Sequence, residues 1–189
     1  EKTIRSYAWV TEGRANSKKE DVDHNMDNLE DAMKQWRGDT TSKIANIREL
    51  ALMVELLYKS AARIGSEKGM TDGEQTFGLS SLQRRHVKAG PNGSIIFEYP
   101  GKKGMMQLYN LKPKDDFDKK LINFIKEKMK GKSPTDWLFT TEDSNKRISD
   151  GMIRAYLKDK VTSWSGGPHK LRSVRGNKLF LDYAKKKPP

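Results

Sequence analysis

The sequence predicts an α+β fold that is mainly helical and contains a small three-stranded antiparallel β-meander. Apolar residues recur at three- and four-residue steps toward both ends of the 189-residue chain, as amphipathic helices require. Between these regions lie three short apolar runs separated by breaks rich in Gly and Pro, which is the pattern of consecutive hairpins. The order of helices, meander and helices is typical of an α+β domain.

The first forty residues differ in character from the rest of the chain. Ile4–Val10 alternates enough for a short strand, whereas residues 11–23 are polar and charged and predict a mobile loop. Asn25–Trp36 places its apolar residues on one side and predicts a helix. We therefore expect residues 1–40 to form an N-terminal extension or linker with one helix, and residues 41–189 to form the core domain.

The strongest helical pattern covers Ile44–Ile64, and Gly65 supplies its expected stop. Arg63 is accordingly expected in the last turn of a buried helix. A guanidinium at that place is costly unless an anion meets it. The apolar positions that define the pattern are Ile44, Ile47, Leu50, Ala51, Val54, Leu57, Tyr58, Ala61 and Ile64.

The meander and the last helices follow from the second half of the sequence. Residues 89–93 and 100–104 are the hairpin breaks of the meander. The three predicted strands are Phe77–Val87, Ser94–Tyr99 and Met105–Leu111. The predicted helices that follow are Asp115–Lys130, Ile148–Val161 and His169–Tyr183, separated by breaks at 133–135 and 165–168.

Composition excludes several classes of site. The chain has no Cys, and its three His are far apart in sequence, so neither a thiolate site nor an H-E-x-x-H metal cluster is expected. No apolar run approaches a membrane span of roughly 18 residues, and the first residues do not read as a signal peptide. With 37 Lys and Arg against 25 Asp and Glu, the net charge is +12. We expect an intracellular, soluble protein with nucleic acid as its polyanionic partner, the alternative being lysines that only keep the chain soluble.

Four basic side chains are candidates for binding a phosphate. Arg63 ends the apolar helix, Lys102 occupies a hairpin tip, and His169 and Arg172 lie three residues apart at the start of a late helix, where an anion is favoured. Two arginines and a lysine can bracket one phosphate. Each also has a structural alternative: Arg63 pairing with a nearby glutamate, Lys102 as a solvated turn residue, and His169 as a helix cap.

Four segments in order resemble the type IB DNA topoisomerases, of the tyrosine recombinase and type IB topoisomerase superfamily. Residues 61–68 resemble that family's arginine-x-glycine-asparagine-glutamate step, and residues 75–87 its threonine-x-glycine-leucine step and following strand. Residues 95–102 resemble its hydrophobic strand ending in Gly-Lys, and residues 171–177 its leucine-arginine-threonine-x-x-x-asparagine helix. The few insertions between segments favour the small poxvirus and bacterial enzymes over the large nuclear ones.

The resemblance implies a mainly helical catalytic domain and a mechanism. A tyrosine attacks a DNA phosphodiester to give a 3′-phosphotyrosyl link, and reversal reseals the strand, so supercoils relax without ATP, a metal or another cofactor. Arg63 and Arg172 would hold the nonbridging oxygens, Lys102 would protonate the departing 5′-oxygen, and His169 would contact the same phosphate. The partner is double-stranded DNA, with no membrane. The further DNA-binding residues expected are Arg84, Arg85, Lys103, Lys170 and Arg175.

Departures from the family pattern keep two alternatives open. Ser66 replaces the usual asparagine, and His169-x-x-Arg172 is the pairing that tyrosine recombinases favour. Tyr183 follows Arg172 by only 11 positions (183 − 172), so it is expected to be a packing or surface residue and the nucleophile is expected beyond residue 189 or lost. The alternatives are a recombinase or integrase catalytic domain and a noncatalytic DNA-binding fragment. A topoisomerase is expected to be a monomer, and a recombinase a multimer on DNA; cytoplasm, nucleoid, nucleus and virion all remain open as its location.

Overall fold

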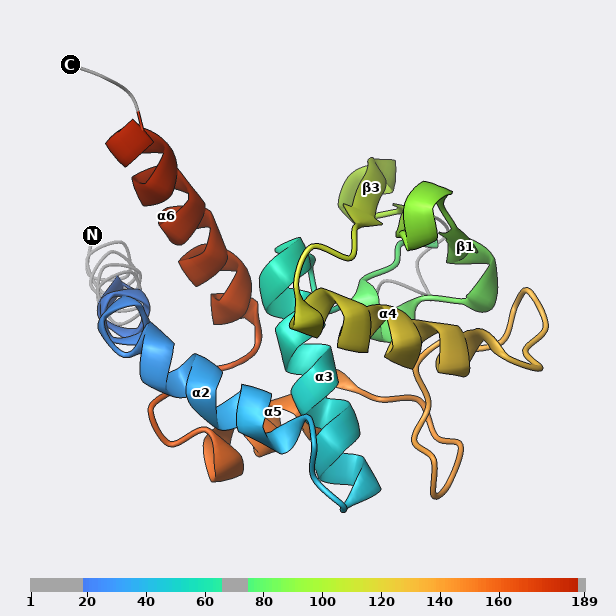
Figure 1. The fold of residues 1–189 in the computed structure, drawn as a ribbon, viewed down its shortest axis with the longest axis horizontal. Helices are drawn as coiled ribbons and strands as arrows, with labels where there is room; N and C mark the ends of the chain where they lie inside the picture. The colour runs from blue at the N-terminus through green and yellow to red at the C-terminus, as the bar shows by residue number, and fades with distance from the viewer. Residues whose placement is uncertain (1–18, 66–74, 187–189) are drawn as a thin grey trace, which may run out of the picture.

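A long central helix organises the molecule. The computed structural model describes residues 19–65 and 75–186. Helix α3 (Ala45–Ser60) lies at the centre and contacts α2 (Leu29–Asp39), α4 (Asp116–Met129), α5 (Asp150–Lys160) and α6 (His169–Lys186). Figure 1 shows α2 and α6 to one side of α3 and the small sheet to the other. The mainly helical α+β prediction is confirmed.

The sheet is the predicted three-stranded antiparallel meander in the order β1-β2-β3. Strand β2 (Ile95–Pro100) pairs with both β1 (Val87–Ala89) and β3 (Met106–Leu111), placing Phe97 opposite Val87 and Tyr109. Alternate residues of β2 are buried, because successive side chains of a strand point to opposite faces. Both hairpin breaks lie where the sequence predicts them.

The predicted strand Phe77–Val87 is wrong over most of its length. Only Val87 joins the sheet, and the residues before it form the short 3₁₀ turns η2 (Leu79–Ser81) and η3 (Arg84–His86). Some backbone N–H groups of this segment donate within the 3₁₀ turns, as Ser81 N does to Gly78 O, and others donate to remote carbonyls. Leu79 N donates to Arg63 O at 2.8 Å, and Arg85 N donates to Pro134 O at 2.9 Å. These hydrogen bonds satisfy the backbone N–H groups without the pairing of a β-sheet.

The helix predicted to run to Ile64 ends earlier, at Ser60. Ala61 adopts the left-handed conformation with φ of 50°, and the Ser60 hydroxyl donates to Leu56 O and accepts from Ala62 N. The stop therefore comes four residues before Gly65. Arg63 lies in an extended connection beyond the helix rather than in its last turn.

The later helices agree with the sequence. Helix α4 begins one residue after the predicted start, because Asp115 is its cap and accepts from Asp118 N at 2.8 Å. Helix α5 begins after Ser149, whose hydroxyl accepts from Met152 N. These are ordinary N-cap contacts. Helix α6 starts at His169 as predicted and continues past Tyr183 to Lys186.

The residues before position 41 share the core of the rest. Residues 19–27 are helical, so the loop predicted over residues 11–23 is wrong for 19–23, and its first part lies outside the described residues, as does the predicted strand Ile4–Val10. Buried Trp36 of α2 donates its indole N–H to Glu55 Oε2 at 2.6 Å, and Arg37 pairs with the same carboxylate at 2.7 Å. The boundary at residue 40 stays a prediction. No helix in residues 19–65 or 75–186 is long and apolar enough to cross a membrane.

A buried histidine next to the sheet makes stability sensitive to mild acid. His86 is 7% exposed, packs against Phe77 with ring centroids 4.3 Å apart, and accepts a hydrogen bond at Nδ1 from Gln83 N. Burial, and then the nearby Arg85 charge, lower the pKa of His86 to about 4. Below pH 6.5 the unfolded chain therefore binds this proton before the folded one does.

We expect acidification from pH 7 to pH 5 to lower the free energy of unfolding by about 2 kcal/mol. The stabilisation is present above pH 6.5 and is lost as the pH falls toward 4. Urea denaturation at the two pH values measures it. The variant His86→Asn keeps an acceptor near the position of Nδ1 and should be less stable than the wild type at pH 7. Its free energy of unfolding should change little between pH 7 and pH 5. If that free energy falls as much as it does in the wild type, another group causes the effect.

Candidate phosphate-binding site

Arg63 is held in place by its own backbone. After the left-handed turn at Ala61, the connection runs beside η2, and the carbonyls of Arg63 and Ile64 accept from Leu79 N and Ser80 N, each at 2.8 Å. Gly78 packs so closely here that a Cβ on it would lie 2.2 Å from Gly65 N. The main chain of Arg63 is thus fixed while its side chain is exposed.

Lys102 projects from the tight turn between β2 and β3. Gly101 N donates to Met105 O at 2.8 Å, and Gly104 N donates to Gly101 O at 3.0 Å. Lys103 takes the left-handed conformation, with φ of 62°, which reverses the chain within three residues. Both lysines of the turn are exposed.

Buried side chains hold the first turn of α6 against the rest of the protein. Leu171 and Val174 are fully buried, so His169 and Arg172, which lie three residues apart, occupy its exposed side. Lys170 points the other way: its ammonium lies 3.0 Å from Asp21 Oδ2 and its side chain is 4% exposed. Hydrogen bonds from Ser165 and Lys170 lower the pKa of Asp21. Lys170 therefore holds α6 to the N-terminal helix, and its role as a DNA contact stays a prediction.

The four candidate residues line two adjoining hollows. One has a volume of about 350 Å³ and the other about 660 Å³. Arg63, Lys102 and Arg172 line both, and His169 lines the larger one. The structure thus brings together side chains from the connection after α3, the β2–β3 turn and the start of α6. The other residues that line both or either hollow include Phe77, Tyr99, Lys103, Gln107, Asp150, Arg154 and Ser173.

The larger hollow is strongly cationic. Among the described residues, five basic side chains line it against the one carboxylate of Asp150, which Arg154 contacts at 3.1 Å. In the smaller hollow, burial raises the pKa of Tyr99, and the nearby Arg172 charge acts in the opposite direction. Guanidinium groups on two sides of an open space fit the oxygens of a phosphate.

Comparison with known proteins identifies the family. The model of the eukaryotic DNA topoisomerase I catalytic core matches residues 11–166. The chain belongs to this family. The matched region includes Arg63 and Lys102 and ends before α6, so His169 and Arg172 join the site through the fold.

Relatives of this topoisomerase core are larger proteins. DNA topoisomerase 1 of Mus musculus is 29% identical over 130 residues, which cover 66% of this chain and 16% of the mouse protein. The human mitochondrial DNA topoisomerase I is 28% identical over 132 residues, covering 66% of this chain and 21% of that protein. The chain spans about a sixth of the length of the first and a fifth of the second. These relatives are eukaryotic proteins. They do not support the predicted similarity to the small poxvirus and bacterial enzymes, which stays a prediction.

The fold extends to a recombinase. A crystal structure of XerH site-specific recombinase bound to difH substrate, in a pre-cleavage complex, superposes with a TM-score of 0.54 at 14% identity. The match covers 84% of this chain and 42% of that chain. At this identity the likeness shows a shared fold.

Three of the described tyrosines of the topoisomerase core are poorly placed as nucleophiles. Tyr183 is 61% exposed on α6, and 11 residues of helix separate it from Arg172 by about 16 Å along the axis. Tyr99 lines the smaller hollow but is buried, and its raised pKa disfavours the phenolate. Tyr156 is buried with its hydroxyl on Asp39. Tyr183 is thus a surface residue, as the sequence predicts.

The expected DNA-binding residues have different surroundings. Arg85 and Lys103 are exposed, and Lys103 lines the smaller hollow. Arg84 is half-buried and donates to Val87 O at 2.8 Å. Arg175 lines a third hollow on another side of α6, with its guanidinium 5.2 Å from the Tyr58 ring centroid.

Sequence reasoning missed Arg154. It lies on α5, lines the larger hollow beside His169 and Arg172, and rests against Gly167, the residue two positions before α6. A Cβ at Gly167 would lie 2.3 Å from Arg154 Nη1. The sequence signal for the space that Arg154 occupies was the glycine pair before the last helix. Such a pair is equally typical of an ordinary loop.

Proposed function

We propose that this chain binds duplex DNA and carries the phosphate-activating part of a type IB topoisomerase. In this reaction a tyrosine cleaves one strand through a 3′-phosphotyrosyl intermediate, and the strand is rejoined, so that supercoiled DNA relaxes without ATP. The observation that carries the proposal is the convergence of Arg63, Lys102, His169 and Arg172 on one cationic hollow.

Each residue has a role that its chemistry suits. Arg63 and Arg172 engage the nonbridging oxygens of the scissile phosphate and stabilise the charge that develops as the phosphorus becomes five-coordinate. Lys102, at the exposed turn, donates a proton to the departing 5′-oxygen. His169 donates a hydrogen bond to the same phosphate. In the resealing direction Lys102 takes the proton back from the 5′-hydroxyl.

Resealing can be tested without knowing the tyrosine. The substrate is a nicked duplex whose upstream strand ends in a 3′-p-nitrophenyl phosphate and whose downstream strand begins with a 5′-hydroxyl. The 5′-oxygen forms a bond to phosphorus, the bond from phosphorus to the aryl oxygen breaks, and nitrophenolate leaves with the electron pair. We expect this chain to produce the ligated strand together with an equal amount of nitrophenolate. Tight binding to the nick without ligation would favour the noncatalytic DNA-binding fragment.

A suicide substrate identifies the nucleophile. A nicked duplex that traps the cleaved state would give a covalent protein–DNA band only if a tyrosine of this chain attacks. A band that vanishes in Tyr183→Phe would place the nucleophile on α6, and one that vanishes in Tyr99→Phe would place it in the smaller hollow. Ligation of the nitrophenyl substrate without a band would mean that the tyrosine comes from elsewhere.

The second candidate is a tyrosine recombinase, favoured by His169-x-x-Arg172 and by the likeness to the XerH fold. It would act at paired specific sites and assemble as a multimer on DNA. Binding to unrelated duplexes with equal affinity and as a monomer would exclude it. Salt-dependent binding does not separate the two, because released counterions give it in both cases.

Gly167→Ala tests whether Arg154 takes part in DNA binding. The new methyl group must displace the guanidinium, which is the end of a flexible side chain, so we expect little change in thermal stability. Loss of one phosphate contact should reduce the slope of log affinity against log salt by about 1. Arg154→Gln should give the same change, and the double variant no further change. An unaltered slope in Arg154→Gln would mean that Arg154 only pairs with Asp150.

A further inference from the structure

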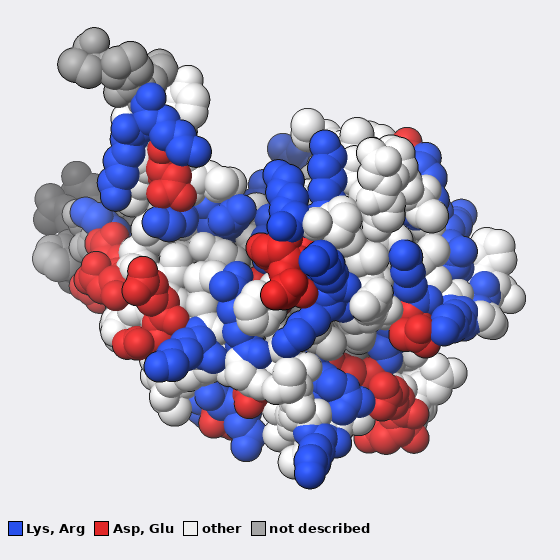
Figure 2. All heavy atoms as spheres, in the orientation of Figure 1, with Lys and Arg blue, Asp and Glu red and all other residues white. Residues whose placement is uncertain are grey.

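A third hollow lies on another side of α6, away from the proposed catalytic residues. It has a volume of about 840 Å³ and is enclosed by α2, α6 and the end of β3 with the loop that follows. Figure 2 shows it as a depression between α6 and the body, with Lys and Arg around it. Arg172 lines the two cationic hollows, whereas Arg175, one turn further along α6, lines this third hollow. We call this hollow the α2–α6 groove.

Part of the α2–α6 groove is apolar, although charged side chains make up more than half of its lining residues. Met26 and Met33 of this lining are half-buried, and Leu181 of α6, which also lines the groove, is 45% exposed. Only Lys170, Leu171 and Val174 of α6 are buried, so its second half covers little of the protein. Exposed apolar surface in a groove with a polar rim is characteristic of a protein-binding site.

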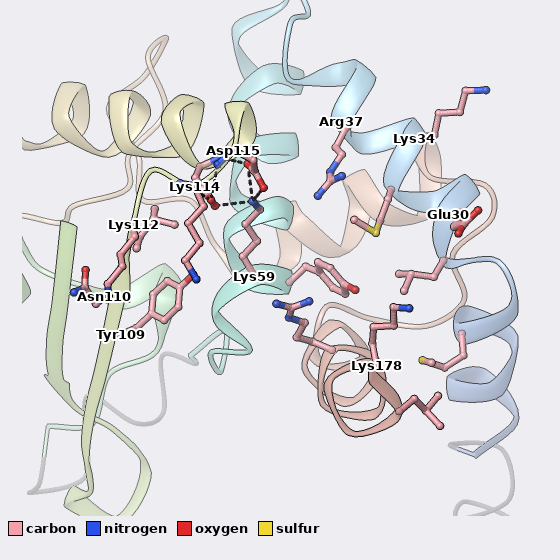
Figure 3. A pocket seen from close by; sticks show the side chains of 18 of the residues that line it. Glu30, Lys34, Arg37, Lys59, Tyr109, Asn110, Lys112, Lys114, Asp115 and Lys178 are labelled. Atoms are coloured by element: carbon pink, nitrogen blue, oxygen red, sulfur yellow. Dashed lines mark hydrogen bonds and ion pairs between the residues drawn. The ribbon is translucent and has the colours of Figure 1, made fainter. Parts of the chain in front are cut away.

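Basic side chains lie on both sides of the groove, together with the carboxylate of Glu30 on the α2 side. Figure 3 shows Lys34 of α2 and Lys178 of α6 on one side and Lys112 and Lys114 on the other. Among the described residues, no carboxylate pairs with Lys34, Lys112 or Lys114. Lys59, by contrast, is neutralised between Asp115 at 2.9 Å and Asp118 at 2.6 Å. Asp115 and Asp118 are thus already paired, whereas Glu30 on the α2 side and these three outer lysines make no ion pair within the described residues.

One guanidinium is also incompletely bonded. Arg175 Nε is buried and makes no hydrogen bond within the described part of the chain, although its guanidinium packs over Tyr58. A buried donor without a partner is costly. The Arg175 side chain forms part of the wall of the groove.

We propose that the α2–α6 groove binds an amphipathic helix of a partner protein, with its apolar side on Met33 and Leu181 and carboxylates along both edges. Apolar side chains such as Met33 and Leu181, together with lysines on both sides of the groove, match that pattern of side chains. Duplex DNA is the weaker candidate, because hydrated phosphates gain nothing from methionine and leucine side chains. The site is separate from the cationic hollows, so the proposal stands independently of catalysis.

Three fluorescent 18-residue helical peptides test the groove. The first has leucines at i, i+3, i+4 and i+7 flanked by glutamates, the second has lysines in place of the glutamates, and the third has serines in place of the leucines. By fluorescence anisotropy, we expect the first to bind at least ten times more tightly than either of the others. Equal binding of all three would overturn the proposal.

Matched variants locate the binding. Lys112→Glu/Lys114→Glu and, separately, Leu181→Ser should each weaken the first peptide at least tenfold. Lys126→Glu/Lys146→Glu makes the same change of charge at exposed lysines outside the groove, and should change its affinity less than threefold. An equal loss in both double variants would show a nonspecific charge effect. A 20-base-pair duplex that displaces the peptide and binds Lys112→Glu/Lys114→Glu tenfold more weakly would assign the groove to DNA.

Discussion

Arg172→Ala should slow ligation of the nitrophenyl phosphate nick by about 10² to 10³-fold, the usual cost of losing one donor to a developing oxyanion. Arg172 lines both cationic hollows and is carried by a helix whose Leu171 and Val174 are fully buried, so the truncation leaves its support intact. Duplex affinity should fall less than tenfold, because one phosphate contact among many is lost. Single-turnover ligation and equilibrium binding, measured on the same DNA, separate the two effects.

Two variants control this measurement. Arg172→Lys keeps the charge but loses the planar fork of donors, so it should recover only part of the rate. Lys158→Ala removes one positive charge from the exposed end of α5, outside both hollows, and should ligate at the wild-type rate. Wild-type ligation by Arg172→Ala would remove Arg172 from the site, and equal losses in Arg172→Ala and Lys158→Ala would show that only overall charge matters.

The parts of the site that sequence predicts well are local. Gly101 and Lys102 lie in a hairpin between two alternating strands, and His169 and Arg172 lie three apart at the start of a helix after Gly-Gly-Pro. Turn chemistry and helical spacing are properties of a few neighbouring residues. The positions of these side chains on their elements therefore follow directly from the chain.

The parts that sequence misses depend on remote partners. The stop of α3 is set by an alanine in the left-handed conformation, where the sequence offers glycine four residues later. Residues 77–86 have the composition of a strand, but their N–H groups bond to carbonyls such as those of Arg63 and Pro134. Tertiary hydrogen bonds here override local preference.

Charge patterns alone do not separate DNA contacts from internal ion pairs. Lys170 lies between two candidate residues in sequence, yet it is buried against Asp21, which is 149 positions away (170 − 21). Arg154 has no motif around it, yet it reaches the larger hollow because Gly167 leaves room for it. Both outcomes are decided by the packing of α6 on its neighbours, which no single segment encodes.

Lys102→Ala should slow ligation to a 5′-hydroxyl by about 10² to 10⁴-fold, the range of general acid–base catalysis. The same variant should join a downstream strand that begins with a 5′-thiol at close to the wild-type rate. A thiol ionises near neutral pH without help, so it attacks phosphorus without giving its proton to Lys102. The product is a 5′-bridging phosphorothiolate, which is also the substrate that should rescue cleavage by the complete enzyme, because the reverse reaction needs no acid for a thiolate leaving group.

The thiol experiment separates proton transfer from phosphate binding. If Lys102 only binds a phosphate oxygen, Lys102→Ala should slow ligation to the 5′-hydroxyl and to the 5′-thiol by the same factor. That result would contradict the role of Lys102 as the acid and base. Arg172→Ala should remain slow with the 5′-thiol, because the charge on the nonbridging oxygens develops with either acceptor. If the 5′-thiol rescues Lys102→Ala but not Arg172→Ala, proton transfer is the role of Lys102 in the β2–β3 turn, and stabilisation of the charged phosphate oxygens is the role of Arg172 on α6. Both residues line the same hollows.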